Sequence, residues 1–335
     1  MKNRQIEHIL VIRTGGIGDL VLSLPLLMAL RNFYPQSWLE VMGYRSRLEL
    51  LEGRYYADRI CSVEQSGMAS FFVQNGILPE KLAQYFASFD MVVSLVSDPD
   101  GLFSANLQRA GVGKVISIAP LPSRSGRGHY SHYLLSQLRH GGVKARLTEP
   151  RLFLTEADRE YASQFWREHG LGRVLAIHAG SGSPRKAWRP EGFAEVAKWA
   201  IEKLGMQVLL VSGPADHQIT RQVVQEMKPR KPLVVENFSL TRLAAILHRC
   251  QGFVGNDSGI THIASAVGTP TVAVFGPSAP RIWAPQGKHT AVVKSSFPCS
   301  PCTRESMHRC QRQKCMDSIT TKEVRKTVEK LLEGS

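Results

Sequence analysis

The chain has 335 residues, and 43 % of them are hydrophobic, which is enough to build the packed cores of about two domains. Its longest apolar stretch, residues 20–30, is much shorter than the ~20 residues that a membrane-spanning helix needs, so a transmembrane helix is excluded. Most of the formal net charge of +14 falls on residues 166–335, and an anionic partner is therefore expected.

Strand-like and helix-like segments alternate through the first half of the chain. The expected strands are 8–13, 38–43, 91–96 and 114–118, and the expected helices are 19–34, 80–87, 103–110 and 129–141. Residues 119–128, which are rich in Pro and basic side chains, are expected to form a loop. Such alternation predicts a parallel sheet covered by helices.

The same alternation starts again in the second half. The expected strands are 173–178, 206–212, 232–235, 251–255 and 270–275, and the expected helices are 156–169, 191–204, 215–227, 239–249, 258–267 and 320–333. Two doubly wound domains follow, residues 1–165 and 166–335. Ligands of such folds bind beyond the carboxyl ends of the strands, so a cleft between the two domains is the expected site.

A glycine-rich turn follows the first expected strand. Gly15, Gly16 and Gly18 let the backbone turn sharply and approach a ligand, and Asp19 comes directly after them. This spacing differs from the G-x-G-x-x-G loop that binds dinucleotides, and an aspartate here would repel phosphate. Asp19 therefore suits a general base, while the alternative is that it only caps the following helix.

Two further loops of the second half suit phosphate binding. Residues 178–188 read H-A-G-S-G-S-P-R-K-A-W, where small residues stand beside Arg185 and Lys186. Residues 256–264 read N-D-S-G-I-T-H-I-A, where Asp257 is expected to cap a helix whose first N–H groups point at a ligand. The alternatives are a plain connecting loop for the first segment and, for His262 in the second, a role in fixing the turn.

The three motifs together resemble glycosyltransferase family 9, the heptosyltransferases of lipopolysaccharide core assembly. The resemblance runs over nearly the whole chain, in the same order and spacing. It implies an α/β protein of GT-B architecture, with two Rossmann-like doubly wound domains facing a central cleft. The N-terminal domain would bind the acceptor and the C-terminal domain the nucleotide sugar.

The resemblance also implies roles for individual residues. Asp19 would be the catalytic base, and Gly15, Gly16 and Gly18 would lie against the acceptor. The donor-binding set would be Ser181, Ser183, Lys186, Asp216, Asp257, Ser258, Gly259 and His262, with Asp216 placed on the ribose by a loose alignment. The sequence Asp98-Pro99-Asp100 lies in an N-terminal loop and not at the donor site, so catalysis without a metal or other cofactor is expected.

The implied reaction moves a heptose from ADP-heptose to a lipopolysaccharide inner-core sugar or related glycan. Basic residues of the acceptor domain, Arg124, Arg127 and His129, would suit an anionic glycolipid, although a solvated basic face is the alternative. Patterns typical of nucleic-acid binding are missing, and so is a signal-peptide cleavage site. A cytoplasmic enzyme is expected, with peripheral association at the inner membrane as an option.

Other functions remain open at this stage. The enzyme could use a different nucleotide sugar, or the chain could bind a nucleotide sugar without catalysing a reaction. A nucleotide-sugar epimerase or NAD-linked oxidoreductase fits less well, because the glycine spacing differs and a Y-x-x-x-K pair is missing.

Four of the six cysteines lie close together near the C-terminus. Cys299, Cys302, Cys310 and Cys315 form the pattern C-x2-C-x7-C-x4-C. In a cytoplasmic protein this clustering favours a structural metal site, zinc or iron, over disulfides, with a reduced or redox-responsive loop as the alternative. Such a site would fix the tail, whose last helix is expected to pack back across the domains.

Overall fold

The computed structural model describes residues 6–120 and 128–334, and the chain divides into two compact units, Met1–Thr148 and Glu149–Ser335. The expected boundary at residue 165 would cut α6 (Glu156–Glu168), which packs on α9 (Leu240–Arg249) of the second unit. The boundary therefore lies before this helix. Within the part of the chain that the structure describes, no helix is both long and apolar enough to cross a membrane.

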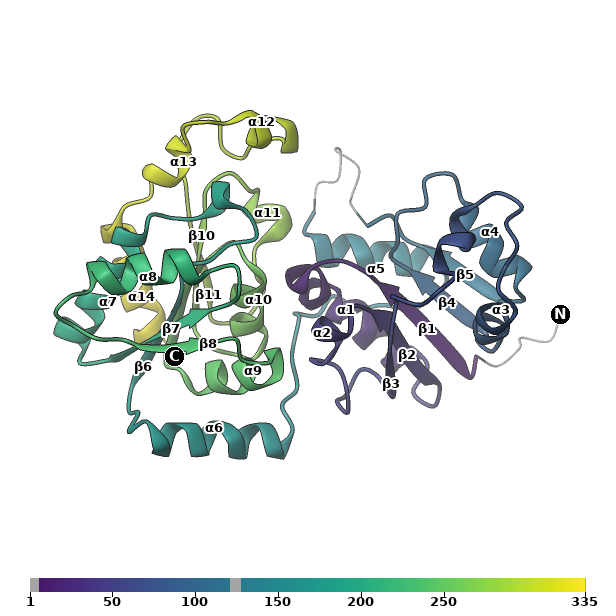
Figure 1. Ribbon diagram of the computed structural model, residues 1–335, viewed down its shortest axis with the longest axis horizontal. Coiled ribbons are helices and arrows are strands. Elements are labelled where there is room, and N and C mark those ends of the chain that lie inside the picture. Colours follow the sequence, from purple (N-terminus) through teal and green to yellow (C-terminus); the bar gives the residue numbers. More distant parts are fainter. Residues whose placement is uncertain (1–5, 121–127, 335) are drawn as a thin grey trace. The chain divides into compact units, whose positions relative to one another are not determined.

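The first unit is built on a five-stranded parallel sheet in the order β3-β2-β1-β4-β5 (Figure 1). Its strands are β1 (His8–Arg13), β2 (Trp38–Gly43), β3 (Arg59–Ser62), β4 (Met91–Ser94) and β5 (Lys114–Ser117). Strand β1 is central, with Val11 opposite Val41 on one side and Val93 on the other. The expected parallel sheet is confirmed, and β3 is an addition that the sequence pattern did not predict.

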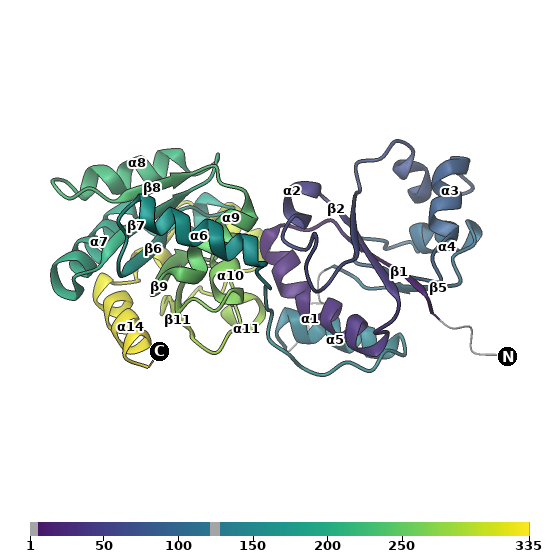
Figure 2. The same ribbon diagram turned by 90° about the horizontal axis from the view of Figure 1, so that it is seen from below.

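Helices cover both faces of this sheet, as Figure 2 shows. They are α1 (Ile17–Phe33), α2 (Arg45–Leu48), the 3-10 helix η1 (Met68–Phe72), α3 (Glu80–Ala87), α4 (Leu102–Arg109) and α5 (Tyr130–His140). Helices α1 and α5 pack together on one face. On the other face, Phe71, Phe86 and Phe103 close over Leu10 and Ile12 of β1 and form a hydrophobic core.

The second unit has a six-stranded parallel sheet in the order β11-β10-β9-β6-β7-β8. Its strands are β6 (Val174–His178), β7 (Gln207–Ser212), β8 (Leu233–Glu236), β9 (Gly252–Asn256), β10 (Thr271–Phe275) and β11 (Thr290–Lys294). The strand order reverses between β6 and β9, which pair directly. In such folds, the loops that follow the two strands at this reversal are the usual place for a ligand.

The helices of the second unit again lie on both faces of the sheet (Figure 2). They are α6, α7 (Pro190–Leu204), α8 (His217–Glu226), α9, α10 (Gly259–Ala266) and α14 (Thr321–Glu333), with the short helices η2 (Pro184–Lys186), α11 (Pro280–Trp283), α12 (Arg304–Arg309) and α13 (Lys314–Asp317).

The last helix, α14, packs within its own unit. It contacts α7, β9, β10 and β11, and its Val324 and Val328 are buried in the core that Trp188 and Phe193 help to form. The indole Nε1 of Trp188 donates a hydrogen bond to the carbonyl of Ile319, just before this helix, at 3.0 Å. The tail is thereby fixed to the second unit, and its expected reach across the domains stays a prediction.

Candidate active site

The first candidate residue, Asp19, lies at the junction of β1 and α1. The helix begins at Ile17, two residues earlier than expected, so Asp19 is its third residue. Its Oδ2 accepts a hydrogen bond from the backbone N–H of Gly16 at 2.7 Å and thus caps the helix. Because 38 % of its side chain is exposed, the carboxylate that caps the helix can also meet a substrate.

Arg13, which the sequence analysis missed, lies behind this carboxylate. It ends β1 and is buried, with its Nη2 3.3 Å from Asp19 Oδ1. The same nitrogen donates a hydrogen bond to the Tyr130 hydroxyl at 3.1 Å, and that hydroxyl donates to the carbonyl of Pro120 at 2.9 Å. Burial raises the pKa of Tyr130 to about 12, so the phenol stays neutral and Asp19 is the anionic partner of Arg13 among the residues that the structure describes.

The glycines of the turn make this pair sterically feasible. A Cβ on Gly15 would lie 2.7 Å from Asp19 Cβ and 2.8 Å from Arg13 Cζ, whereas a Cβ on Gly16 would come no closer than 3.5 Å to Asp19 Oδ2. Gly18 lies in the first turn of α1. Gly15 is therefore required for the local packing, and acceptor contact by the three glycines stays a prediction.

The other expected acceptor residues are placed as follows. Arg124 and Arg127 lie outside the described residues. His129 is buried and is the N-cap of α5, where its Nδ1 accepts a hydrogen bond from the Ser131 N–H at 3.2 Å. Asp98 was not among the expected acceptor residues but was expected in an N-terminal loop away from the donor site, and it accepts hydrogen bonds from backbone N–H groups at the start of α4. His129 thus has a structural function, and its acceptor contact stays a prediction.

The donor motifs meet at the carboxyl ends of β6 and β9. Lys186 of η2 places its Nζ 2.8 Å from Asp257 Oδ2, although the two residues are far apart in the sequence. Buried Asn256 holds both ends of the loop that carries Lys186. Its Nδ2 donates to the carbonyl of Ala179 at 2.8 Å, and its Oδ1 accepts from the Trp188 N–H at 2.9 Å. The fold therefore joins the two phosphate motifs into one site.

The start of α10 differs by one residue from expectation. Ser258, not Asp257, is the N-cap, and its Oγ accepts a hydrogen bond from the Thr261 N–H at 3.4 Å. The expectation that Asp257 caps this helix was wrong, because its carboxylate pairs with Lys186 instead. Gly259 is the first helical residue and buried His262 lies one turn later, while their contacts with a donor stay predictions.

A second missed residue, His178, links Ser258 to Asp216. It is buried at the end of β6, with Nδ1 3.1 Å from Ser258 Oγ and Nε2 3.1 Å from Asp216 Oδ2. Burial alone would raise the pKa of Asp216, but hydrogen bonds from His178 and the Gly213 N–H outweigh it and lower that pKa. Asp216 is therefore an ionised and fixed carboxylate, and its contact with a ribose stays a prediction.

Two serines of the first donor loop, Ser181 and Ser183, lie near Asp257 and at the start of η2. Ser181 Oγ is 3.5 Å from the carbonyl of Asp257, and Ser183 is the N-cap residue of η2. A Cβ on Gly180 would collide with the Asp216 carboxylate, so this loop needs glycine where it passes that side chain. The loop is thus packed against both Asp257 and Asp216.

All four clustered cysteines of the second unit are free thiols. Burial and the neighbouring thiols raise the pKa of Cys302 to about 11, whereas hydrogen bonds from the backbone N–H groups of Arg312 and Gln313 lower that of Cys310. Among the described residues, no three His, Cys, Asp or Glu side chains are already assembled to hold a metal. The expected metal therefore stays a prediction.

Comparisons with known proteins match this chain to one family. The model of "Glycosyltransferase family 9 (heptosyltransferase)" matches residues 130–311, which is more than half of the chain. Lipopolysaccharide heptosyltransferase 2 of Escherichia coli K12 is 27 % identical over 150 residues, which is 43 % of this chain and 43 % of that protein. The alignment thus spans less than half the length of this curated relative.

Two solved structures share the fold over almost their full length. A family 9 glycosyl transferase from Veillonella parvula superimposes with a TM-score of 0.83 at 25 % identity and covers 100 % of this chain and 99 % of that one. The E. coli heptosyltransferase WaaC with ADP-2-deoxy-2-fluoro heptose gives a TM-score of 0.66 at 16 % identity and covers 96 % and 99 %. The fold is the expected GT-B type, with two Rossmann-like domains, and the chain belongs to glycosyltransferase family 9.

Proposed function

We propose that the protein transfers a heptose from ADP-heptose to a sugar of the lipopolysaccharide inner core or a related glycan. A bond forms between an acceptor hydroxyl oxygen and the anomeric carbon, while the bond from that carbon to the diphosphate breaks. The proton of the hydroxyl goes to a general base, and ADP leaves from the opposite face, so the anomeric configuration inverts. This reaction agrees with the names of the relatives, one of which is a complex with an ADP-heptose analogue.

The proposal depends chiefly on the pairing of Lys186 with the start of α10. A cation lies 2.8 Å from Asp257, next to a helix whose first turn carries no acidic residue. Backbone N–H groups at such a helix start attract phosphate, and a neighbouring ammonium adds countercharge. Both would stabilise the charge that develops on the departing diphosphate, so no metal ion is needed for that purpose.

Asp19 is the residue we assign as general base. Its carboxylate is partly exposed, and the Gly16 N–H and the Arg13 guanidinium hold it in one orientation. A carboxylate fixed in this way can accept a proton from a hydroxyl as the new bond forms. In the part of the chain that the structure describes, the Arg13 guanidinium pairs with Asp19 and bonds to Tyr130, so we assign it as a positioning residue.

We infer an anionic acceptor from the charge of the chain. The basic residues Arg124 and Arg127, together with His129, belong to the first unit, where the family would bind its acceptor. Carboxylates and phosphates of an inner-core glycolipid would complement the charges of the two arginines. Such an acceptor also implies peripheral association with the membrane that carries it.

Calorimetric titration tests the donor assignment. The purified protein is titrated with ADP-heptose, ADP, UDP-sugars and GDP-sugars, each with and without EDTA. We expect saturable binding of ADP-heptose that persists in EDTA, followed by heptose transfer to a lipopolysaccharide-core acceptor. Tighter binding of a different nucleotide sugar would overturn the assigned donor.

A further inference from the structure

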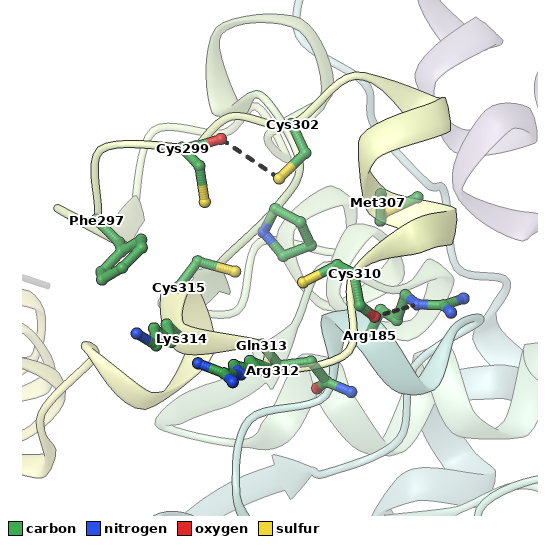
Figure 3. A pocket seen from close by; sticks show the side chains of 11 residues that line it. Arg185, Phe297, Cys299, Cys302, Met307, Cys310, Arg312, Gln313, Lys314 and Cys315 are labelled. Atoms are coloured by element: carbon green, nitrogen blue, oxygen red, sulfur yellow. Dashed lines mark hydrogen bonds between the residues drawn. The ribbon is translucent and has the colours of Figure 1, made fainter.

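The four clustered thiols surround a cavity in the second unit. Cys299, Cys302, Cys310 and Cys315 line a space of about 140 Å³, and Figure 3 shows their Sγ atoms pointing toward one another across it. They come from the loop before α12, from the end of that helix and from α13, so the chain wraps around the cavity. Four convergent sulfurs are a ligand set that suits a thiophilic metal ion.

The surroundings of Cys310 suit a thiolate. The backbone N–H groups of Arg312 and Gln313 form hydrogen bonds with Cys310, an arrangement that stabilises a negatively charged sulfur. Arg185, Arg312 and Lys314 also line the cavity and bring positive charge to it. A divalent ion held by four thiolates has a net charge of about −2, which these three cations would more than offset.

The apolar part of the lining would limit the access of water. Pro277, Phe297 and Met307 line the same cavity, and Phe297 also packs against the core of the second unit. Because Cys315 is buried and Cys299 is exposed, the cavity has an inner and an outer side. An ion could therefore enter from the outer side and be held against the core.

We propose that these four cysteines bind one thiophilic divalent cation, such as Fe²⁺ or Zn²⁺, as a tetrathiolate site. The thiols are not assembled at ligand distances in the described structure, so segment 299–315 would close around the ion. Each thiol releases its proton to solvent as its sulfur–metal bond forms.

The site would also hold the donor loop in place. Arg185 donates a hydrogen bond from Nε to the carbonyl of Cys310 at 3.2 Å, and the next residue is Lys186. Fixing Cys310 on a metal therefore fixes the backbone that carries Lys186. This second half of the inference rests on the proposed function, while the metal site itself does not.

Cobalt uptake tests the metal site. The full-length protein is reduced, stripped of metal and titrated anaerobically with Co²⁺, whose bonds to thiolates give a characteristic visible absorption. We expect one equivalent to bind. Cys299→Ser, at an exposed position, should weaken binding by more than the ~10-fold that changes outside the ligand set cause, while Cys61→Ser in the first unit should leave it unchanged. Titration without this absorption, or the same affinity in Cys299→Ser with circular dichroism unchanged, would overturn the site.

ADP binding tests the link to the donor loop. We expect the Co²⁺-loaded protein to bind ADP at least about 5-fold more tightly than the stripped protein, and this difference to disappear in Arg185→Gln. Equal ADP affinity in the loaded and stripped proteins would overturn the link. If neither form binds ADP while Co²⁺ uptake is normal, the proposed donor function fails and the metal site stands.

Discussion

The β1–α1 and β9–α10 junctions have the same backbone plan and opposite electrostatics. Both follow a buried strand of a parallel sheet and start a helix. At the first junction Asp19 lies inside the first turn of the helix and bonds back to the Gly16 N–H. At the second, the first turn carries no acidic residue, and the neutral hydroxyl of Ser258 is the cap.

The position of one carboxylate decides what each junction can bind. The start of α1 already has its own anion, so it presents a fixed base to a neutral hydroxyl. The start of α10 can bind an external anion at its backbone N–H groups, because Asp257 precedes the helix and pairs with Lys186. In the proposed reaction, the first junction therefore provides the base for the attacking hydroxyl, and the second stabilises the leaving diphosphate.

The largest expected effect comes from removing the carboxylate of the first junction. Asp19→Asn keeps an oxygen that can cap α1 but cannot accept the acceptor proton. We expect transfer to fall by about 10²–10⁴-fold while ADP affinity stays the same. Initial rates with ADP-heptose and a calorimetric titration with ADP measure the two quantities.

Asp98→Asn is the matched control for this variant, because Asp98 also accepts hydrogen bonds from a helix start in the same unit. Both variants should lose some stability, and only the first should lose transfer. If Asp19→Asn retains the wild-type rate, Asp19 is no more than a helix cap.

The second effect tests the cation of the other junction. Lys186→Met removes the ammonium beside Asp257 and should lower kcat by about 10²–10³-fold, because the leaving diphosphate loses a partner. ADP binding should weaken as well, in contrast to Asp19→Asn. Lys198→Met, on α7 and bonded only to the carbonyl of Glu226 in the contacts described, should change neither quantity. Loss of transfer with unaltered ADP affinity would contradict a phosphate contact in the ground state.

Sequence pattern was sufficient for the elements that build both junctions. Apolar runs and glycine turns predicted both ends of β1 correctly and each end of β9 to within one residue. Strands β3 and β11, which lie at sheet edges and have one buried side chain each, were missed, whereas the edge strands β5 and β8 were predicted. A strand pattern needs burial on at least one face, and an edge strand has little of it.

The missed site residues had a recognisable signal. Arg13 and His178 are each the last residue of a buried strand, where a polar side chain reaches the ligand-binding edge of a parallel sheet. Their partners could not be predicted, because His178 reaches Ser258 only through the pairing of β6 with β9. Strand order across a crossover is a property of the whole sheet, and the local sequence does not contain it.

The third effect tests the geometry of the first junction with two adjacent glycines. Gly15→Ala puts a methyl group 2.7 Å from Asp19 Cβ and should cost about 1–3 kcal/mol of stability and displace the base. Gly16→Ala meets nothing closer than 3.5 Å, so it should cost less, about 0.5 kcal/mol for the poorer N-cap of α1. Urea denaturation and initial rates compare the pair. Equal effects of the two substitutions would mean that Arg13 and Asp19 are not held as closely as described.

The smallest expected effect is a pH dependence confined to the second unit. The pKa of Asp216 is lowered in the folded protein: burial opposes the charge, and the hydrogen bonds from His178 and Gly213 outweigh that burial. The unfolded state therefore binds the proton more readily, so the carboxylate stabilises the fold above its ordinary pKa of 3.8. This contribution is lost as the pH falls below 3.8 toward the lowered pKa.

Asp216→Asn should remove that part of the pH dependence. Unfolding in urea, followed by tryptophan fluorescence at neutral pH and below pH 3.8, measures it, because four of the five tryptophans lie in the second unit. We expect the difference in stability between wild type and variant to shrink as the pH falls through this range. A constant difference would mean that His178 does not hold Asp216 in its ionised form. The contact between the two side chains would then contribute to stability by packing and not by charge.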